Sequence, residues 1–207
     1  MVAQPPVTPL PLPALSGVHI VEGGEGRGGG HETPVMSERT LSSETVFTGK
    51  VFSVQSDRVR LPHGPEVLMH VVRHAASVIL LPMPDPDHIV LVRQYRYVID
   101  QWIWELPAGS IDPGETAEHA AVRECHEEIA QVPTGVVRLG AFYPTPGYCD
   151  ELMIFFRLTG LKEPDHEAEP DEDENIETKV FTLAEARHLV QEGNTPDMKT
   201  AFGLTLV

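Results

Sequence analysis

Residues 105–128 read ELPAGSIDPGETAEHAAVRECHEE, and this stretch decides how the rest of the chain is interpreted. Its second half predicts a helix over 116–129, because Val122, Cys125 and Ile129 recur at helical spacing and form one apolar stripe. Thr116 stands where an N-cap is needed, and its hydroxyl can accept a backbone N–H there. We therefore expect an amphipathic helix whose apolar stripe is buried.

The polar side of this helix carries a cluster of glutamates. Glu124 and Glu128 lie four residues apart and share a face, with Glu127 beside them. The cluster can be an ordinary solvated acidic face, partly neutralised by Arg123, although like charges at this spacing cost about 0.2–0.5 kcal/mol per pair. The loop before the helix favours a second interpretation, in which the glutamates bind metal.

In that loop, Gly109 and Gly114 flank a tight turn through Asp112-Pro113, which would bring a backbone carbonyl near the helix. Carboxylates, a carbonyl and water form an oxygen-only site. Such a site suits Mg²⁺, which uses few protein ligands and completes its shell with substrate phosphates. Metal ions held between these carboxylates and a polyphosphate could polarise phosphoryl oxygens and activate water.

The spacing of these residues resembles the Nudix box. Gly109 is followed after five residues by Glu115, and after seven more by the run Arg123-Glu124-Cys125-His126-Glu127-Glu128. The motif fixes the spacing of its residues over more than twenty positions, so a chance match is improbable. The resemblance implies hydrolysis of a nucleoside diphosphate linked to another moiety, with Mg²⁺ or Mn²⁺ as cofactor.

The resemblance also implies roles for individual residues of the box. Glu124 and Glu128 would bind metal, together with the carbonyl of Ala108. Glu127 would be a ligand or would support one, and Arg123 would fix the glutamates in place.

At its end this box departs from the family pattern of a glycine followed by an aliphatic residue, because Ala130 and Gln131 stand there. The change falls at the helix exit, where glycine commonly serves as a cap. We therefore expect it to affect local geometry more than the glutamates.

Outside the box, about residues 38–205 resemble the ADP-ribose pyrophosphatase subgroup. Pro146, fifteen residues beyond Gln131, stands at the marker position of that subgroup and is followed by Glu151. Tyr148 stands where the diadenosine polyphosphate subgroup has its marker, so that substrate class stays open. The segment around Pro146 can also be simply a turn.

The run Arg93-Gln94-Tyr95-Arg96-Tyr97, ahead of Trp104-Glu105-Leu106-Pro107, resembles the same subgroup, in which the second arginine contacts substrate. Arginine suits a diphosphate because its planar fork makes charge-assisted, bidentate hydrogen bonds. The alternatives are a strand-edge arginine paired with an acid and, for the neighbouring tryptophans, a place in the core. The substrate-binding set implied by the resemblance is Arg96, Glu151, Gly147 and Trp102.

Residues 171–176, Asp-Glu-Asp-Glu-Asn-Ile, resemble the acidic catalytic loop of the subgroup, although composition alone favours a solvated charged loop. There the first glutamate of a Glu-x-Glu pair is the general base and the second binds metal. These roles fall on Glu172 and Glu174, with Asp171 and Glu174 as alternatives for the base. The implied catalytic set is Glu172, Glu127 and Arg123, the last in a structural role.

The patterning of the whole chain predicts an α/β protein with a Nudix fold, a mixed β-sheet sandwiched between α-helices. We expect strands at 46–54, 58–61, 67–73, 77–81, 89–92, 136–143, 152–158 and 178–181, a loop between 92 and 116, and a second helix at 183–191. Residues 1–37, rich in proline and glycine, predict a disordered extension. Residues 38–207 would form the Nudix domain, with 38–73 as an N-terminal β segment.

Composition narrows the choice of partners. The chain has 207 residues and a formal net charge of −16, from 31 acidic and 15 basic residues, without a basic run that could attract nucleic acid. No apolar run approaches the roughly 20 residues that span a bilayer. Two cysteines, Cys125 and Cys149, cannot build a disulfide framework. We expect a cytoplasmic protein that binds neither nucleic acid nor membrane.

The subgroup resemblance implies Mg²⁺-dependent hydrolysis of ADP-ribose to AMP and ribose 5-phosphate. It also implies a homodimer in which the N-terminal strands reach the partner's site. Three alternatives remain. The substrate can be another nucleotide-sugar or a dinucleoside polyphosphate, or the chain can be a module that binds ADP-ribose without cleaving it. RNA pyrophosphohydrolysis is the third, and the acidic net charge opposes it.

Overall fold

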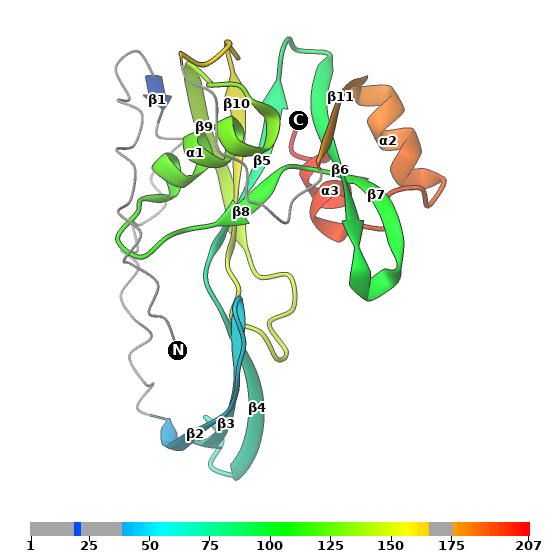
Figure 1. The fold of residues 1–207 in the computed structure, drawn as a ribbon. Helices are drawn as coiled ribbons and strands as arrows, with labels where there is room; N and C mark the ends of the chain where they lie inside the picture. The colour runs from blue at the N-terminus through cyan, green and yellow to red at the C-terminus, as the bar shows by residue number, and fades with distance from the viewer. Residues whose placement is uncertain (1–18, 22–38, 166–175) are drawn as a thin grey trace, which may run out of the picture.

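The computed structural model describes residues 19–21, 39–165 and 176–207. Strands within these ranges form three sheets, and a few helices cover them (Figure 1). The largest sheet has the order β1-β9-β10-β5-β8, with β1 at His19–Val21, β5 at Ser77–Met83, β8 at Ala108–Ser110, β9 at Gly135–Phe142 and β10 at Met153–Thr159. It is mixed, because β1 and β9 pair in parallel, as do β10 and β5, whereas β10–β9 and β5–β8 are antiparallel. The α/β prediction with a mixed sheet is therefore confirmed.

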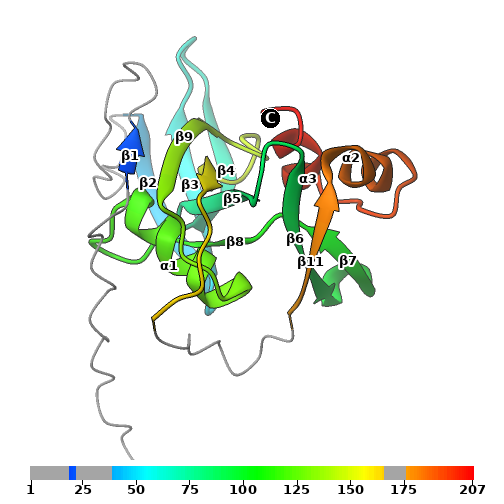
Figure 2. The ribbon, with the colours of Figure 1, turned by 90° about the horizontal axis from the view of Figure 1, so that it is seen from above.

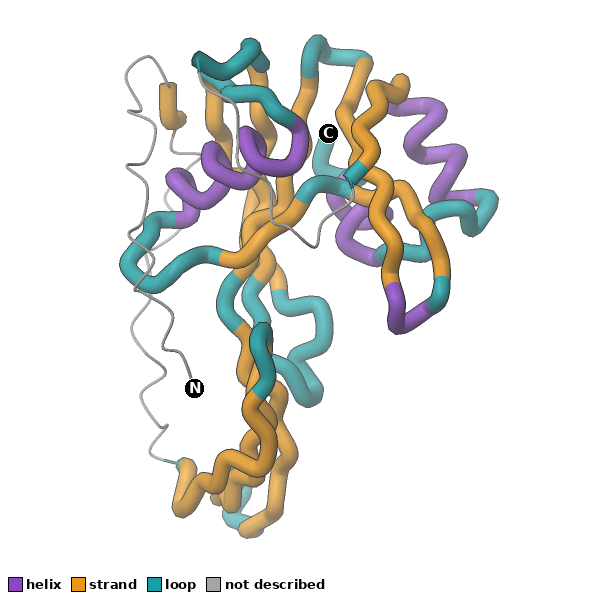
Figure 3. The backbone as a smooth tube through the Cα atoms, in the orientation of Figure 1, coloured by secondary structure: helices purple, strands orange, loops and turns teal. Residues whose placement is uncertain are grey.

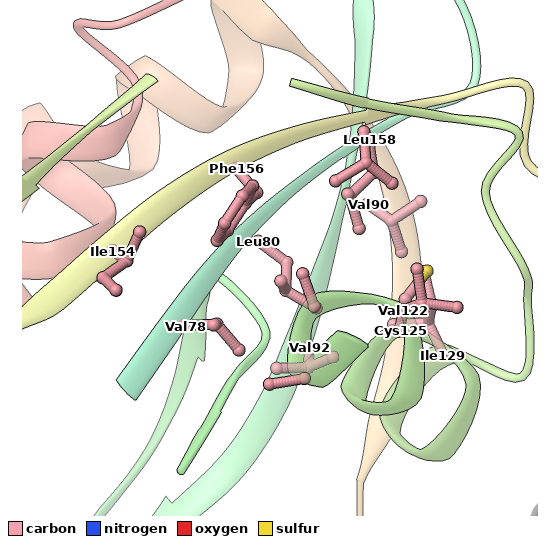
Figure 4. Close-up of a cluster of buried hydrophobic side chains, with 13 residues drawn as sticks. Val78, Leu80, Val90, Val92, Val122, Cys125, Ile129, Ile154, Phe156 and Leu158 are labelled. Atoms are coloured by element: carbon pink, nitrogen blue, oxygen red, sulfur yellow. The ribbon is translucent and has the colours of Figure 1, made fainter. Parts of the chain in front are cut away.

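Strand β5 lies at the centre of the core, with every residue buried. Its side chains alternate between two faces, as strand geometry requires. Val78 and Leu80 pack in a cluster with the apolar stripe of helix α1 (Ala117–Ile129), as Figure 4 shows. Ile79 and Leu81 pack in a second cluster with residues of the C-terminal helices. The sheet is thus covered on both faces.

The second sheet, of order β11-β6-β7, is antiparallel and lies beside the C-terminal helices (Figure 2). It consists of β6 (His88–Arg96), β7 (Gln101–Glu105) and β11 (Glu177–Thr182), with a 3₁₀ turn, η1 (Tyr97–Ile99), between β6 and β7. Helix α2 (Leu183–Gln191) starts in a capping box between Thr182 and Glu185. Helix α3 (Met198–Gly203) starts at the N-cap Asp197.

The third sheet is the antiparallel β2-β3-β4, formed by β2 (Thr40–Thr48), β3 (Phe52–Arg60) and β4 (Glu66–His74). It projects away from the rest of the molecule (Figure 1). We call it the N-terminal sheet. Several of its large apolar side chains are exposed, namely Leu41, Val46, Phe47, Val51, Phe52, Leu68 and Met69. None of the helices within the described residues is long and apolar enough to cross a bilayer.

Three expectations about local structure differ from what is observed. The single strand expected over 46–54 is two strands, because the chain turns where the Gly49 N–H donates to the Phe52 carbonyl at 2.9 Å. The loop expected between 92 and 116 contains the end of β6 together with β7 and β8. Within the proline- and glycine-rich extension, His19–Val21 form β1, which pairs with Gly135–Val137 of β9.

Candidate active site

Helix α1 begins as the sequence predicts, with the Thr116 hydroxyl accepting the His119 N–H at 3.2 Å. Val122, Cys125 and Ile129 are buried, so the apolar stripe is confirmed. Burial raises the pKa of the Cys125 thiol, which keeps it protonated and inert at neutral pH. With this stripe packed on the sheet, the glutamates are directed toward the loop that precedes the helix.

Arg123 gathers the acidic side chains of this region into one cluster. Its Nη1 donates to Glu124 Oε1 at 2.7 Å and to Glu127 Oε2 at 2.8 Å. Its Nε and Nη2 donate to the two carboxylate oxygens of Glu115 at 3.0 and 2.9 Å, and Nη2 also donates to the Ser110 carbonyl at 2.9 Å. One guanidinium therefore holds the loop and the helix together, which supports the structural role inferred for it.

The charges in this cluster stabilise one another. Burial alone would raise the pKa of Glu115, but hydrogen bonds from Arg123 and from the Asp112 N–H outweigh burial and lower that pKa. For Arg123, burial opposes the charged form, and the carboxylates of Glu115 and Glu124 more than compensate, so its pKa is raised. The ion pair between Glu115 and Arg123 is thus favoured in its charged form.

Strand β8 presents its backbone to the glutamates at close range. A Cβ built on Gly109 would lie only 1.9 Å from the Cδ atom of Glu124, so the carboxylate occupies the space that any side chain at 109 would need. One residue earlier, the Ala108 N–H donates to Glu128 Oε2 at 3.2 Å. Glycine at 109 therefore allows the close approach of the Glu124 carboxylate to β8 and does not serve a turn.

These residues suit a divalent cation in the chemistry of their donors. Glu124, Glu127 and Glu128 are oxygen donors next to the backbone of Ala108, which is the ligand type that Mg²⁺ and Mn²⁺ prefer. The space at Gly109 admits the Glu124 carboxylate, as a metal site between helix and loop requires. Within the described residues, no three His, Cys, Asp or Glu side chains already stand together as a metal-binding group.

A second ionic cluster surrounds Glu105, at the end of β7 and three residues before Ala108. Its side chain is only 2% exposed, and it accepts Arg96 Nε on Oε1 at 2.8 Å. Its other oxygen pairs with Lys199 of helix α3, which also contacts Asp197 at 3.1 Å. The substrate-binding candidate Arg96 is therefore positioned by a buried carboxylate, itself held by a lysine 94 residues further along the chain.

Other predicted substrate contacts lie on different parts of the molecule. Glu151 accepts the Ser77 hydroxyl at 2.7 Å, and Ser77 pairs with Ser110, whose carbonyl accepts from Arg123. Gly147 lies exposed in the loop between β9 and β10, with open space where a Cβ would be. The structure therefore brings Glu151 near the Arg123 cluster through Ser77, while Gly147 has no such link.

Trp102 lies on β7 and is 47% exposed. Its ring packs against Tyr95, with 5.7 Å between the ring centroids, and its ring centroid lies 5.7 Å from the Arg93 guanidinium carbon. It is thus a surface residue, whereas Trp104 packs edge-on against Phe181 in the second core cluster. The acidic-loop residues Glu172 and Glu174 lie outside the described residues.

Sequence reasoning missed Glu105 and Lys199 as members of the ionic cluster around the candidate Arg96. A hint for Glu105 is present, because a charged residue stands between the buried apolar residues Ile103 and Leu106. Lys199 follows the capping residue Asp197, but its partner is far away in sequence and no local spacing connects the two.

Comparisons of the sequence and of the structure with known proteins agree on one family. The protein-family model described as "NUDIX domain" matches residues 72–201 of this chain. An ADP-ribose pyrophosphatase from Bacillus subtilis (strain 168) is 34% identical over 169 residues, 82% of this chain and 91% of the relative. One from Mycobacterium tuberculosis (strain ATCC 25618 / H37Rv) is 35% identical, over 81% of this chain and 82% of the relative. A crystal structure of an ADP compounds hydrolase superposes with a TM-score of 0.70 at 25% identity, covering 81% of this chain and 90% of its own.

Proposed function

The chain belongs to the Nudix family, in its ADP-ribose pyrophosphatase subgroup, and from this premise we propose that it hydrolyses ADP-ribose to AMP and ribose 5-phosphate. The observation that carries the proposal is the cluster around Arg123, in which the guanidinium binds Glu115, Glu124 and Glu127 at once. A protein that only bound the nucleotide would not need three glutamates held next to one backbone strand.

The proposed roles follow from the donor chemistry. Glu124, Glu128 and the Ala108 carbonyl, together with Glu174, would hold Mg²⁺, with Mn²⁺ as the alternative ion. When bound, such an ion neutralises charge that develops on the phosphate oxygens. Glu127 and Arg123 keep the metal-binding glutamates in position, and this support rests on the hydrogen bonds of Arg123.

The chemical step we propose is attack of water on one phosphorus of the diphosphate. Glu172 would accept the proton of the water as general base, and the bond between that phosphorus and the bridging oxygen would break. AMP and ribose 5-phosphate are the two products. Arg96 would bind the diphosphate with the outer part of its guanidinium, because Glu105 occupies its Nε.

The remaining substrate contacts are assigned to Glu151, Gly147 and Trp102. We propose that they bind the sugar and nucleoside ends of ADP-ribose or a related nucleotide-sugar. Support for Glu151 comes from its place beside Ser77 and β8, and support for Trp102 from its exposed ring, which can stack on a base.

We further propose that the domain spans 38–207 and functions as a homodimer, with the N-terminal sheet reaching the partner's site. The exposed apolar side chains of this projecting sheet support the proposal, since a monomer rarely leaves so many uncovered on one small sheet. The extension 1–37 is assigned no catalytic role.

The test is product analysis after incubation of the purified chain with ADP-ribose, with and without Mg²⁺. AMP and ribose 5-phosphate formed only with metal are the expected result. If ADP-ribose stays intact, a panel of other nucleotide-sugars and dinucleoside polyphosphates shows whether the substrate is different. Tight binding of ADP-ribose without cleavage would identify a binding module and contradict the proposal.

A further inference from the structure

The loop between β9 and β10 does not extend freely into solvent. It folds back alongside β4 of the N-terminal sheet (Figure 3). The Val72 N–H donates to the Tyr148 carbonyl at 2.7 Å, and the Asp150 N–H donates to the Val72 carbonyl at 3.2 Å. Backbone hydrogen bonds in both directions thus make residues 148–150 an extra partner of β4, in parallel with it at Val72 and Cys149. We call residues 143–151 the substrate loop, because it contains Gly147 and Glu151.

One side chain fastens the substrate loop to the sheet. Arg73 Nη1 donates to Asp150 Oδ2 at 3.0 Å, Nη2 donates to Asp57 Oδ2 at 2.6 Å, and Nε donates to Gln55 Oε1 at 2.8 Å. The guanidinium of β4 therefore bonds to two residues of β3 and one of the loop. The second oxygen of Asp150 accepts the His74 N–H at 3.0 Å, so both carboxylate oxygens are bound.

Asp57 makes this arrangement rigid. Its side chain is only 3% exposed, and it accepts the Ser43 hydroxyl of β2 at 2.5 Å as well as the Arg73 guanidinium. A buried carboxylate needs such partners, because an unpaired buried charge is strongly destabilising. Asp57 therefore fixes the position of Arg73, and the fixed guanidinium in turn fixes Asp150.

We propose that Arg73 is a positioning residue for the substrate loop, and that it makes the loop and the N-terminal sheet a single substrate-binding unit. Through Asp150, the neighbouring Glu151 is held where it meets Ser77 at the start of β5. The inference rests on the function proposed above for Glu151 and Gly147. It assigns to Arg73 an effect on substrate binding, and leaves the chemical step to the residues of α1.

A thiol in the loop gives a readout that does not depend on catalysis. Cys149 is partly exposed and its Sγ accepts the Glu151 N–H at 3.5 Å, whereas the other cysteine, Cys125, is buried. A chromogenic disulfide reagent should therefore label Cys149 when the loop opens, and Cys125 only when the whole domain unfolds. Labelling of Cys125 reports loss of the fold within the same experiment.

The variant Arg73→Met keeps the apolar stem and removes the guanidinium. We expect about tenfold faster labelling of Cys149 and a KM for ADP-ribose raised about tenfold, with kcat within about threefold of the parent, since charge-assisted hydrogen bonds hold the loop. Arg73→Lys can make only some of the hydrogen bonds that the guanidinium makes. Its labelling rate and KM should therefore lie between those of the parent chain and those of Arg73→Met. The control is Arg157→Met, at an exposed position of β10 outside both the substrate loop and the N-terminal sheet, and it should change neither quantity.

Asp150→Asn is the second variant, because it weakens the loop anchor while leaving Asp57 paired with Arg73. If Arg73→Met proves unfolded, as labelling of Cys125 would show, Asp150→Asn decides the question. Unchanged labelling of Cys149 in a folded variant overturns the proposal, whether or not the chain hydrolyses ADP-ribose. Faster labelling with kcat reduced at unchanged KM also overturns it, because the loop would then act on chemistry and not on binding.

Discussion

Glu128 accepts the Ala108 N–H, and it is a proposed metal ligand whose charge matters more than its shape. The variant Glu128→Gln keeps the volume and the hydrogen-bond acceptor but removes the negative charge. We expect kcat to fall about 100-fold or more, the scale associated with damage to a metal site, with little change in melting temperature. Glu118→Gln, in the first turn of the same helix, is the matched control and should retain activity. Near-normal turnover of Glu128→Gln would contradict its assignment as a ligand.

Gly109 is a position where a single methyl group should be decisive. In Gly109→Ala the new Cβ would lie 1.9 Å from the Glu124 Cδ, so the carboxylate has to leave its place beside β8. Because only the terminal part of a side chain is displaced, we expect a modest fall in melting temperature and a fall in kcat of about 100-fold. Steady-state kinetics with thermal melting tests this, and an active Gly109→Ala variant would show that Glu124 can work from another position.

At the scale of elements, the ion cluster of Arg123 ties the loop before α1 to the helix, and its strength should depend on pH. The pKa of Glu115 is lower in the folded chain than its ordinary value of 4.5, so the folded state keeps this carboxylate ionised to lower pH than the unfolded state does. The stabilisation is therefore complete well above pH 4.5 and is lost as the pH falls through the folded pKa. We expect Glu115→Gln to lower the free energy of unfolding more at pH 7 than at pH 3, as measured by denaturant titration. An equal loss at both pH values would contradict this.

The end of helix α1 carries strain that the sequence departure at Ala130 creates. Ala130 has φ 53° and ψ 39°, the left-handed conformation that glycine adopts without a penalty. We expect Ala130→Gly to raise the free energy of unfolding by about 0.5–1 kcal/mol, since relief of strain exceeds the extra entropy of the unfolded chain. The same substitution at Ala117, at the helix start, should be neutral or destabilising. Denaturant unfolding measures both variants. If each substitution lowered the free energy of unfolding by the same amount, the prediction would be refuted.

The elements that the sequence predicted well are those whose signals are local. The cap at Thr116, the stripe from Val122 to Ile129 and the doubly covered strand β5 each follow from neighbouring residues. The turn at Gly49 was missed because apolar residues flank it on both sides, at Val46-Phe47 and Val51-Phe52, so that the stretch resembles one strand. Strands β7 and β8 were missed because they are short and separated by Leu106-Pro107, where a loop signal dominates.

Residues of the candidate site also differ in whether a local sequence signal could place them together. Glu124, Glu127 and Arg123 could be placed together because the motif sets their spacing on one helix, and the structure joins them. The Arg96–Glu105–Lys199 cluster could not be found, since its members meet only after three separate elements have packed. Whether Glu172 and Glu174 join the site stays a prediction, as they lie outside the described residues.

At the scale of the whole molecule, the projecting N-terminal sheet leads to a prediction about assembly. Leu68 is 57% exposed on β4, so Leu68→Asp should not disturb the monomer but should oppose burial in a dimer interface. We expect sedimentation of the parent chain at twice its 22.8 kDa mass, and of Leu68→Asp at the monomer mass with reduced activity. Val180→Asp, 52% exposed on β11, is the control and should remain dimeric. A monomeric parent chain would exclude the homodimer.

The pairing of Glu105 with Lys199 also bears on when this enzyme becomes active during its synthesis. The two residues are 94 positions apart, so at about 5–20 residues per second the ribosome needs about 5–20 seconds between making one and making the other. Throughout that interval Glu105 can pair with Arg96 but lacks Lys199, the second cation, which binds its other carboxylate oxygen in the folded chain, so burial of the strand that carries it is less favourable. Nascent chains that already contain the complete Nudix box should therefore be silent, and hydrolysis should begin only after the segment carrying Lys199 has emerged and docked.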